Sequence, residues 1–532
     1  MKAIVDRKTM QEIDRVTIEE IGIPSMVLME RAALKVFLRI QDKILAKKED
    51  PKKERVLVVC GIGNNGGDGI AVARLLFEAK IPVSIQLLGS KEKFTKEMSM
   101  QVKIVEKLGV PFVEQPTYND YSIIVDAIFG VGLTRMITGE YETVIHEVNK
   151  SNAIVVAVDL PSGINADDGS IMNVAIKADY TVTFGYQKVG LVRYPGREYG
   201  GDIYVEDVGF PSQVFDLVKK NNQDYVDSFI YTKDDLNRVP IRPKHSHKGT
   251  FGTVLVIAGS KGMSGACYLS AKAAYRTGAG LIKVLTVKEN RQIIQTLLPE
   301  AVVLTYGEEE LEDQRIRESY IKEFNHAKCI IIGPGIGINH QSEKILQFVL
   351  ENAKIPIVID ADAINILAKW IDKQIVRDHY EKLDMRDQVT MRLNILLKII
   401  PQNVVLTPHL KEFSRLLDQN IEKINKNFID MVDLCFYNKV LICIIKDSVT
   451  TVLSNKKRYY NTSGNDALAT GGSGDVLTGI IGSFISQGLD AFEASCLGVY
   501  VHGLTAEYYS EQNYKGSMMA SDIVETIGKV II

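Results

Sequence analysis

Short apolar runs alternate along the chain with segments whose hydrophobic residues recur at helical spacing. The runs are continuous rather than alternating with polar residues, as expected of strands buried on both faces of a sheet. The clearest runs are Val56–Cys60, Val83–Leu88, Ile123–Val125, Ile154–Val158, Val254–Ile257, Ile330–Ile332, Ile357–Ile359 and Val440–Ile445. This pattern predicts parallel α/β sheets, in which ligand sites lie at the carboxyl ends of the strands.

The pattern is interrupted over Pro211–Val239, which is polar and shows no strong buried strand. A new strand, glycine-rich loop and helix begin at Gly252. A chain of 532 residues has room for two or three domains of about 100–250 residues each. We therefore expect one domain over 1–225 and a second over 226–532. The segment Trp370–Asn403, with mixed charge and helical spacing, predicts an added helical pair without a function of its own.

The composition, 46% hydrophobic and 24% charged, is that of an ordinary globular protein. A net charge of −3 gives no basic field for nucleic acid or an anionic membrane, so local groups must hold any anionic ligand. The N-terminus has no apolar signal core, and no stretch of 18 or more apolar residues provides a membrane span. The expected location is the cytoplasm.

The cysteines are scattered, with no CxxC pair and no zinc-ligand spacing. Most lie in apolar runs, which predicts buried thiols in a reducing compartment. They are Cys60, Cys267, Cys329, Cys435, Cys443 and Cys496.

The first strand runs into Gly61–Gly69, which reads GIGNNGGDG and precedes a helix. Its glycines allow close approach of a ligand, and the helix N-terminus offers free N–H groups to an anion. The GxGxxG within it is a weak sign of a Rossmann dehydrogenase. Such an enzyme usually has an acidic residue after the next strand, where this chain has Gly89, Ser90 and Lys91, and that disfavours a dehydrogenase. A plain turn of Asn and Gly is the structural alternative.

Two further strands close on aspartates. Asp126 is followed by a glycine-rich loop, and Asp159 by Pro161-Ser162-Gly163. Such a carboxylate can serve as acid, base or cation ligand, or merely cap a helix. Two of them converging on an Asn-rich segment favour a functional site.

These motifs, with the string ADYTVTFG at Ala178–Gly185, resemble the N-terminal YjeF-type domain, the NAD(P)H-hydrate epimerase, over about residues 1–210. The resemblance implies a Rossmann-like three-layer sandwich, substrate contact by Asp159 as the candidate acid–base, and a potassium ion held by Asn65, Asp126 and Ser162. The other implied substrate contacts are Asn64, Asn65, Gly66, Gly67, Asp68, Gly130, Val131, Gly132, Leu133, Thr134, Arg135 and Met136. One departure is Arg31, where the family usually has Asn; it is expected to loosen a helix contact near the site.

In the second domain, the turn before Asp475 reads ATGGSGDVL and leads directly into an apolar helix. Successive N–H groups of such a turn can hold a phosphoryl group in transfer. Asp475 could accept a hydroxyl proton, or act only as a helix cap. No Walker A loop is present, which excludes a P-loop enzyme.

Other polar strand ends offer less specific signals. Lys446–Thr450 could meet nucleotide phosphates or form a surface turn. His409, near Glu412, is a lone histidine and such residues are more often structural. Asp360 and Asp362 follow a strand and could instead cap a helix.

Together with the strings GPGIG, IDADAIN and LTPH, these motifs resemble the YjeF C-terminal domain over about 243–532. That family is the ADP- or ATP-dependent NAD(P)H-hydrate dehydratase, with a ribokinase-like α/β fold. The resemblance implies Asp475 as catalytic base and Mg²⁺ as cofactor. The substrate contacts implied are Ala266, Gly337, His409 and Asp475, and the nucleotide contacts are Lys446, Asp447, Ser448, Val449, Thr450 and Gly474. Two departures are present. Asp447 stands where the family usually has Gly, which is expected to weaken nucleotide binding, and Leu410-Lys411 replaces the family's Pro-Gly before Glu412; neither lies in the phosphoryl-transfer loop.

The expected protein is thus a bifunctional isomerase and lyase of metabolite repair. Its expected substrates are NADHX and NADPHX, with ADP as co-substrate giving AMP and phosphate. The choice of ADP over ATP and the preference between NADHX and NADPHX stay open, and a homo-oligomer is expected. Two alternatives remain: a vitamin-precursor or sugar kinase carrying a ligand-binding domain, and a non-catalytic NAD(P)-sensing module.

Overall fold

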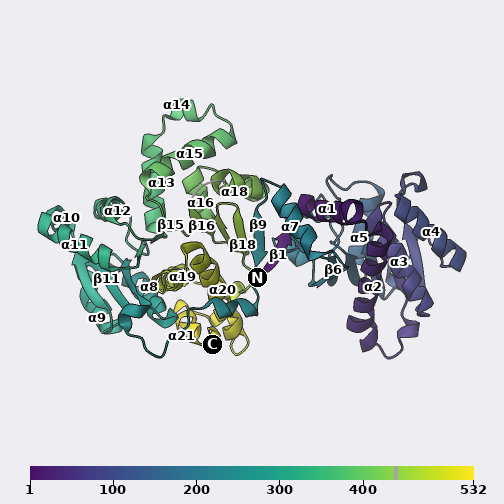
Figure 1. Cartoon of the computed structure of the whole chain (residues 1–532), viewed down its shortest axis with the longest axis horizontal. Helices are drawn as coiled ribbons and strands as arrows, with labels where there is room; N and C mark the ends of the chain where they lie inside the picture. Colours follow the sequence, from purple (N-terminus) through teal and green to yellow (C-terminus); the bar gives the residue numbers. More distant parts are fainter. Residues whose placement is uncertain (437–440, 532) are drawn as a thin grey trace. The chain divides into compact units, whose positions relative to one another are not determined.

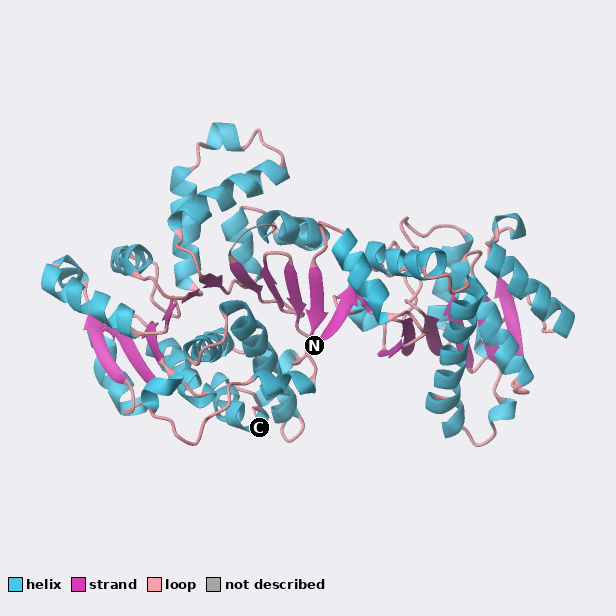
Figure 2. Ribbon diagram, in the orientation of Figure 1, coloured by secondary structure: helices cyan, strands magenta, loops and turns pink. Residues whose placement is uncertain are grey.

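The computed structural model describes residues 1–436 and 441–531, with side chains 435 and 436 also left undescribed. Its contacts separate two compact units. The N-terminal unit is Ala3–Tyr225, and the C-terminal unit is Val226–Ile532 together with Met1–Lys2. Each unit is a strand layer covered by helices (Figure 1, Figure 2). The parallel α/β architecture predicted from the apolar runs is confirmed.

The N-terminal unit has a parallel sheet in the order β3-β2-β4-β5-β6-β8. Its strands are β2 (Val56–Cys60), β3 (Val83–Leu87), β4 (Ile123–Ala127), β5 (Ile154–Val158), β6 (Tyr180–Phe184) and β8 (Asp202–Glu206). The larger helices are α2 (Ser25–Lys43), α3 (Asn64–Glu78), α4 (Lys96–Leu108) and α5 (Glu140–Lys150). Separate hydrophobic clusters lie on the two faces of the sheet, which makes three layers. The chain adds β3 on one side of β2 and then β4 on the other side, so the strand order reverses direction at β2. A crevice that can hold a ligand is expected at the carboxyl ends of strands where the order reverses.

Helix α3 begins earlier than the sequence indicated. Asn64–Gly69 forms its first turns and not a loop before it. A Cβ on Gly66 would lie 2.0 Å from the Gly61 carbonyl oxygen, and one on Gly69 would lie 2.4 Å from the Ala127 Cβ. These glycines therefore serve close packing of the helix against the ends of β2 and β4.

The C-terminal unit has strands in the order β12-β11-β10-β13-β14-β15-β16-β17-β18-β9. They are β9 (Asp227–Ile230), β10 (Thr253–Ile257), β11 (Leu281–Val287), β12 (Val302–Tyr306), β13 (Cys329–Ile332), β14 (Ile357–Ile359), β15 (Val404–Leu406), β16 (Ile442–Ile445), β17 (Thr451–Ser454) and β18 (Lys457–Tyr460). The sheet is parallel from β12 to β16 and antiparallel through β17 and β18. Large apolar clusters cover both faces.

The helices that flank the candidate site of this unit are α8 (Ser264–Thr277), α13 (Asp362–Gln374), α16 (Leu410–Leu417), α19 (Ser473–Ser486) and α20 (Ala491–Ser510).

The stretch Pro211–Val239 was wrongly expected to lack a buried strand. It contains α7 (Ser212–Asn221) and β9, whose residues Ser228 to Ile230 are buried beside β18. Four residues that begin with Asp and Ser carry too weak an apolar pattern to be recognised. Of the run Val440–Ile445, Val440 lies outside the described residues and β16 covers the end of the run.

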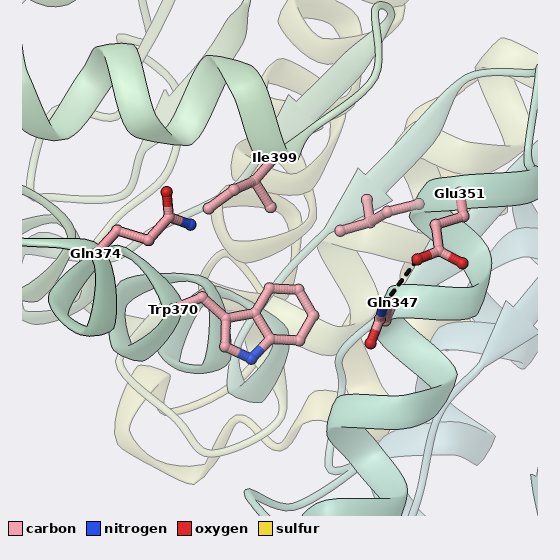
Figure 3. Close-up of a pocket in the computed structure, with 6 residues that line it drawn as sticks. Gln347, Glu351, Trp370, Gln374 and Ile399 are labelled. Atoms are coloured by element: carbon pink, nitrogen blue, oxygen red, sulfur yellow. Dashed lines mark hydrogen bonds between the residues drawn. The ribbon is translucent and has the colours of Figure 1, made fainter.

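The segment Trp370–Asn403 is helical, as its spacing indicated. It contains the end of α13, the short α14 (Arg377–Tyr380) and α15 (Met385–Ile399). The buried Arg392 guanidinium donates to the Asp372 carboxylate at 2.7 Å and to the Leu416 carbonyl at 2.8 Å, which fixes α15 to its neighbours. An open cavity of about 340 Å³ is lined by Gln347, Leu350, Glu351, Trp370, Gln374 and Ile399 (Figure 3).

The described cysteines Cys60, Cys267, Cys329, Cys443 and Cys496 are free thiols and buried. The side chain of Cys435 lies outside the described set. Among the described residues, no helix has both the length and the apolar character that a membrane span requires.

Candidate active sites

A cavity of about 720 Å³ opens at the carboxyl ends of β2, β4 and β5 in the N-terminal unit. The lining residues expected from the sequence are Asn64, Asn65, Asp68, Gly130, Val131, Gly132, Leu133, Thr134, Arg135 and Asp159. Gly66 and Gly67 instead lie buried in α3, where a Cβ on Gly67 would meet Met29, and Met136 is exposed outside the lining. The structure thus gathers most of the expected substrate residues around one cavity.

Asp159 is held firmly at the end of β5. Its backbone has φ +66°, a left-handed conformation that costs free energy in a non-glycine residue. Oδ1 accepts hydrogen bonds from Lys188 Nζ at 2.6 Å and Thr183 Oγ1 at 3.1 Å, while Oδ2 accepts from the Val131 N–H at 3.1 Å. The carboxylate is therefore fixed at the cavity wall with a preset orientation.

Lys188 is the partner that the sequence did not reveal. It lies on the short strand β7 (Gln187–Lys188), and its side chain is only 1% exposed. Its ammonium also donates to Thr183 Oγ1 at 2.9 Å and to the Phe184 carbonyl at 3.1 Å. Lysines are almost never fully buried unless they are paired with an opposite charge, and here the Asp159 carboxylate supplies that charge. Its place directly after the apolar strand β6 is the signal that could have identified it.

Asp126 and Ser162 form a compact buried pair beneath the cavity. Ser162 Oγ donates to Asp126 Oδ1 at 2.5 Å, and the Ser162 N–H donates to Oδ2 at 2.7 Å. The Ile128 N–H adds a third hydrogen bond at 3.2 Å. Burial raises the pKa of Asp126 to about 6, although the Ser162 hydrogen bonds oppose that rise.

Asn65 lies near Gly130 and the Asp159 carboxylate. A Cβ placed on Gly130 would lie 2.9 Å from Asn65 Oδ1 and 3.1 Å from Asp159 Oδ2. The glycine therefore leaves the space between these two side chains open. The Asn65 Nδ2 is buried with no hydrogen-bond partner among the described residues. A buried donor without an acceptor indicates that a ligand group belongs beside it.

Two more carboxylates reach this cavity. Asp14, on α1 (Arg7–Arg15), and Asp68, on α3, both line it. Burial raises the pKa of Asp14 to about 6, while the Lys188 charge lowers it and Asp159 raises it. Burial, then Asp159 and Asp14, raise the pKa of Asp68 well above its usual value. Asp14 was not identified from the sequence, because it lies far from the glycine-rich motifs.

In the C-terminal unit, α19 begins directly after a left-handed Gly472 (φ +87°). A Cβ on Gly474 would lie 3.2 Å from Lys446 Nζ and 3.7 Å from Asp360 Oδ2. Glycine at this position therefore leaves the amides of the turn open beside an ammonium group. Such a turn suits a phosphate.

Asp475 lies in the first turn of α19. None of the described residues donates a hydrogen bond to its carboxylate. Burial raises the pKa of Asp475 to about 7, and nearby Asp360 raises it while Lys446 lowers it. A half-protonated, unpaired carboxyl near neutral pH is poised for proton transfer.

Lys446 is paired with Asp360 behind this turn. Its Nζ donates to Asp360 Oδ1 at 2.7 Å, and Thr407 Oγ1 donates to the same oxygen at 2.6 Å. Burial lowers the pKa of Lys446, but the carboxylates of Asp360 and Glu412 outweigh that effect, and the net pKa is raised. The ammonium is thus kept charged beside Gly474.

The rest of the expected nucleotide segment forms the hairpin between β16 and β17. Asp447 and Ser448 are exposed, Thr450 is half-buried, and the Val449 side chain is buried. At Val449, therefore, only the backbone is available to a ligand. The Lys446 N–H donates to the Pro408 carbonyl at 2.8 Å, which places this hairpin beside His409.

His409 caps α16. Its Nδ1 accepts from the N–H groups of Lys411 and Glu412, at 3.1 and 3.2 Å. Burial, with the charge of Lys446, lowers the pKa of His409, so its ring is neutral. The cap leaves about half of the side chain exposed (49%) and able to meet a ligand.

The remaining expected substrate contacts lie on neighbouring loops. The Gly337 N–H donates to Asp362 Oδ2 at 2.9 Å, and Asp362 raises the pKa of Asp475. A Cβ on Gly335 would lie 3.0 Å from the Ala266 Cβ, so this loop packs on α8. These contacts bring Ala266 and Gly337 to the same end of the sheet as Asp475.

A buried histidine behind the turn was missed. His502 Nε2, on α20, lies 3.1 Å from Ser473 Oγ and 3.1 Å from the Ser473 carbonyl. Burial lowers the pKa of His502 to about 4, so the ring is neutral. It supports the first turn of α19 from inside the core.

The fold and its two sites define the class of the molecule: a two-unit α/β protein with a largely buried carboxylate at the strand ends of each unit. Residues 25–190 match the family model of the YjeF-related protein N-terminus. Residues 254–381 and 389–529 match the model of NAD(P)H-hydrate dehydratase. The unmatched residues 382–388 span the end of the loop after α14 and the first turn of α15.

Relatives of nearly full length agree with both matches. The bifunctional NAD(P)H-hydrate repair enzyme Nnr of Dictyoglomus turgidum is 32% identical over 96% of this chain and 94% of its own length. The NAD(P)H-hydrate epimerase of Oenococcus oeni is 49% identical over 38% of this chain and 96% of its own. The chain belongs to the family of bifunctional NAD(P)H-hydrate repair enzymes.

Among solved structures, the ADP/ATP-dependent NAD(P)H-hydrate dehydratase of Bacillus subtilis, co-crystallised with ATP/Mg2+, is 26% identical. The likeness covers 57% of this chain and 96% of that one, with a TM-score of 0.45.

Proposed function

We propose that the protein repairs hydrated NADH and NADPH, with an epimerase in the N-terminal unit and a nucleotide-dependent dehydratase in the C-terminal unit. The observation that carries the proposal is the group at the start of α19, where an unpaired Asp475 stands beside open turn amides and the charged Lys446. That arrangement combines a base with a site for phosphoryl charge.

In the dehydratase, Asp475 takes the proton from the hydroxyl on the hydrated ring of the S epimer. The hydroxyl oxygen then attacks the terminal phosphorus of the nucleotide, and the turn amides with Lys446 stabilise the charge on the transferring group. Phosphate leaves far more readily than hydroxide. Its C–O bond breaks, the neighbouring ring carbon loses a proton to water, and the C–H electron pair forms the double bond that restores the dihydronicotinamide. With ADP, the co-substrate we favour, the products are AMP and phosphate.

When bound together with the nucleotide, Mg²⁺ would reduce the negative charge of the phosphates. Among the described residues, no group of three or more His, Cys, Asp or Glu side chains could cage a metal. The site therefore fits Mg²⁺ held mainly by phosphates and waters, as this ion prefers. Asp475 and Asp360 are the nearest carboxylates that could add a ligand.

In the epimerase, Asp159 exchanges a proton with the oxygen carried by the hydroxyl-bearing ring carbon, while Lys188 holds the carboxylate in place. Asn65, Asp126 and Ser162 would hold potassium through oxygen atoms alone, the donor type suited to a hard cation. Three of the roughly four acceptor positions of the Asp126 carboxylate are filled by hydrogen bonds, which leaves room for one ion contact. A bound potassium would join the loops after β4 and β5.

Purified S epimer tests the dehydratase and its nucleotide. ADP should support recovery of NADPH absorbance with equal release of AMP and phosphate, and faster turnover with ATP would reverse the donor assignment. A stable phosphorylated product would favour the kinase alternative. Nucleotide binding without any product would favour the sensing module.

R epimer tests the other unit in buffers of potassium or of sodium. Epimerisation should be several-fold faster in potassium, and Asp126→Asn should remove that difference. A homo-oligomeric state, the further expectation, is checked by light scattering of the full chain.

A further inference from the structure

The cavity of the N-terminal unit holds a titratable group that the proposed reaction has not used. Asp14 lies on α1, ahead of residues 25–190 that match the family model. It nonetheless lines the same cavity as Asp159 and the glycine-rich loop Gly130–Gly132. The sequence motifs and the family match therefore leave it without a role.

The surroundings of Asp14 and Asp159 differ in one respect. Asp159 accepts three hydrogen bonds, one of them from the buried Lys188. None of the described residues donates a hydrogen bond to the Asp14 carboxylate. Its neighbour on the helix, Glu12, instead pairs with Arg15 at 2.8 Å on the surface. Asp14 thus faces the cavity with its hydrogen-bonding capacity unused.

Asp14 and Asp159 also interact electrostatically. The charges of Lys188 and Asp159 both act on Asp14, and Asp14 in turn acts on Asp68. The two carboxyl groups thus lie in one cavity with different surroundings, one paired with an ammonium group and one without a hydrogen bond from the described residues. Acid and base assignments commonly follow such a division.

Epimerisation at a carbon that bears both a hydroxyl and the ring nitrogen requires two proton transfers. The departing oxygen gains a proton, and the oxygen of the arriving water loses one. One C–O bond must break on one face of the ring and another must form on the other face. An acid is needed for the departing oxygen and a base for the arriving water. Asp159 alone can supply only one of these at a time.

We propose that Asp14 is the second catalytic acid–base of the epimerase, acting opposite Asp159. The protonated Asp14 carboxyl gives its proton to the hydroxyl, the C–O bond breaks, and the ring nitrogen lone pair forms a C=N⁺ bond. Water adds to the opposite face, closing that double bond back to the nitrogen, and Asp159 takes the proton released. Exchange with solvent returns each carboxyl to its starting state, and the reverse direction exchanges their roles.

The protonation state of Asp14 supports this assignment. Burial raises the pKa of Asp14 to about 6, so part of the population carries the proton close to neutral pH. The charged groups facing it across the cavity are Lys188, Asp159 and Asp68, with Arg135 and Glu97 further along the lining. An acid with this pKa should make epimerisation by the free enzyme slow down as pH rises above about 6.

The inference rests on the proposed epimerase, and both units of the full chain test it together. Asp14→Asn should slow conversion of R to S epimer by about 100-fold, after subtraction of the spontaneous rate. Dehydration of supplied S epimer should stay within about twofold of the unchanged chain. Asp14→Glu, which keeps a carboxyl group, should lose less than Asp14→Asn. Glu12→Gln is the matched control, since it removes a carboxylate from the surface of the same helix.

The pH profile separates a catalytic role from a structural one. The unchanged chain should show kcat/KM for epimerisation falling above about pH 6, and Asp14→Glu should shift that limb while Glu12→Gln keeps it. If Asp14→Asn unfolds the unit, the shifted limb of Asp14→Glu decides instead. Epimerisation within about threefold of normal in Asp14→Asn, or an unshifted limb in Asp14→Glu, would overturn the role of Asp14. An unchanged chain with no epimerase activity would overturn the proposed function as well.

Discussion

The two units present their key aspartates in opposite ways. Asp159 is buried against Lys188 at 2.6 Å and held in a left-handed backbone conformation. Asp475 stands in the first turn of α19 with no hydrogen bond to its carboxylate from the described residues, and the nearest ammonium, Lys446, is engaged by Asp360. One carboxylate is thus fixed and neutralised by the protein, and the other waits for a partner from outside.

This difference follows from what each group must do. A carboxylate that exchanges a proton with an oxygen on one face of a ring benefits from a fixed position, because a displacement of an ångström costs much of the rate. A carboxylate that takes a proton from a hydroxyl is a stronger base when it is unpaired. Loss of a supporting residue should therefore affect epimerisation most at the Asp159 site. A change of pH should affect dehydration most at the Asp475 site.

The largest expected effect separates the two units. Asp475→Asn keeps the shape of the side chain but cannot accept the proton, so dehydration of S epimer should fall on the order of 1000-fold. Epimerisation should continue at the normal rate. Recovery of NADPH absorbance and chromatographic separation of the epimers measure the two activities. Near-normal dehydration in this variant would remove Asp475 from its role.

The support of Asp159 is the next test. Lys188→Met leaves a buried carboxylate without its partner, which should lower the free energy of unfolding by about 3 kcal/mol and abolish epimerisation. The double variant Lys188→Met with Asp159→Asn should regain most of the stability but none of the activity. Circular dichroism during denaturation measures the first quantity. Equal instability of the single and double variants would show that charge pairing is not what Lys188 supplies.

Trp370, the one tryptophan of the chain, lies in the C-terminal unit. Its fluorescence should therefore keep its unfolding midpoint in both Lys188 variants.

The pH dependence should distinguish the unpaired site. Because Asp475 acts as a base and its pKa is raised to about 7, kcat/KM for dehydration should rise about tenfold per unit below pH 7 and level off above it. The contribution of Asp475 to the free energy of unfolding should decrease as pH rises, whereas the dehydration rate should increase. The folded state holds this proton more tightly than the unfolded chain, so the contribution of Asp475 to stability is present below about pH 4 and is lost as pH rises through 7. Asp475→Asn should therefore stabilise the protein at pH 8, and a loss of stability there would contradict this.

A smaller effect is expected at the nucleotide hairpin. Asp447 is exposed next to Lys446, and its negative charge opposes binding of phosphates. Asp447→Gly should tighten ADP binding by about threefold at low salt, less at high salt. Titration calorimetry measures the affinity. Unchanged affinity would show that this hairpin does not face the phosphates.

The smallest expected effect concerns the departure at Arg31. Its Nη1 donates to the Val208 carbonyl at 3.2 Å and so links α2 to the end of β8. The looser helix contact expected from the sequence stays a prediction, and this hydrogen bond is the contact that replacement of Arg31 would remove. Arg31→Asn should cost about 1 kcal/mol and change epimerisation less than threefold. Thermal unfolding and the epimer assay check both, and a large activity loss would place Arg31 in substrate binding.

The apolar runs and glycine-rich strings were sufficient to predict the parallel sheets and the part of the cavity lining that lies at the strand ends, because both depend on residues adjacent in sequence. Lys188 and Asp14 were not found, since they reach Asp159 from 29 and 145 positions away along the chain. The position of Asn64–Gly69 inside α3 was also missed. Glycines that usually mark a loop are helical here because strand ends approach too closely for any side chain.

The most direct test of the whole account uses acid-hydrated NADPH that contains both epimers, with Mg²⁺, potassium and ADP or ATP. Complete recovery of NADPH absorbance is the predicted result, since the N-terminal unit converts R to S and the C-terminal unit consumes S. Recovery that stops at the S fraction would contradict an active epimerase. No recovery with either nucleotide would contradict the dehydratase, and with it the central claim.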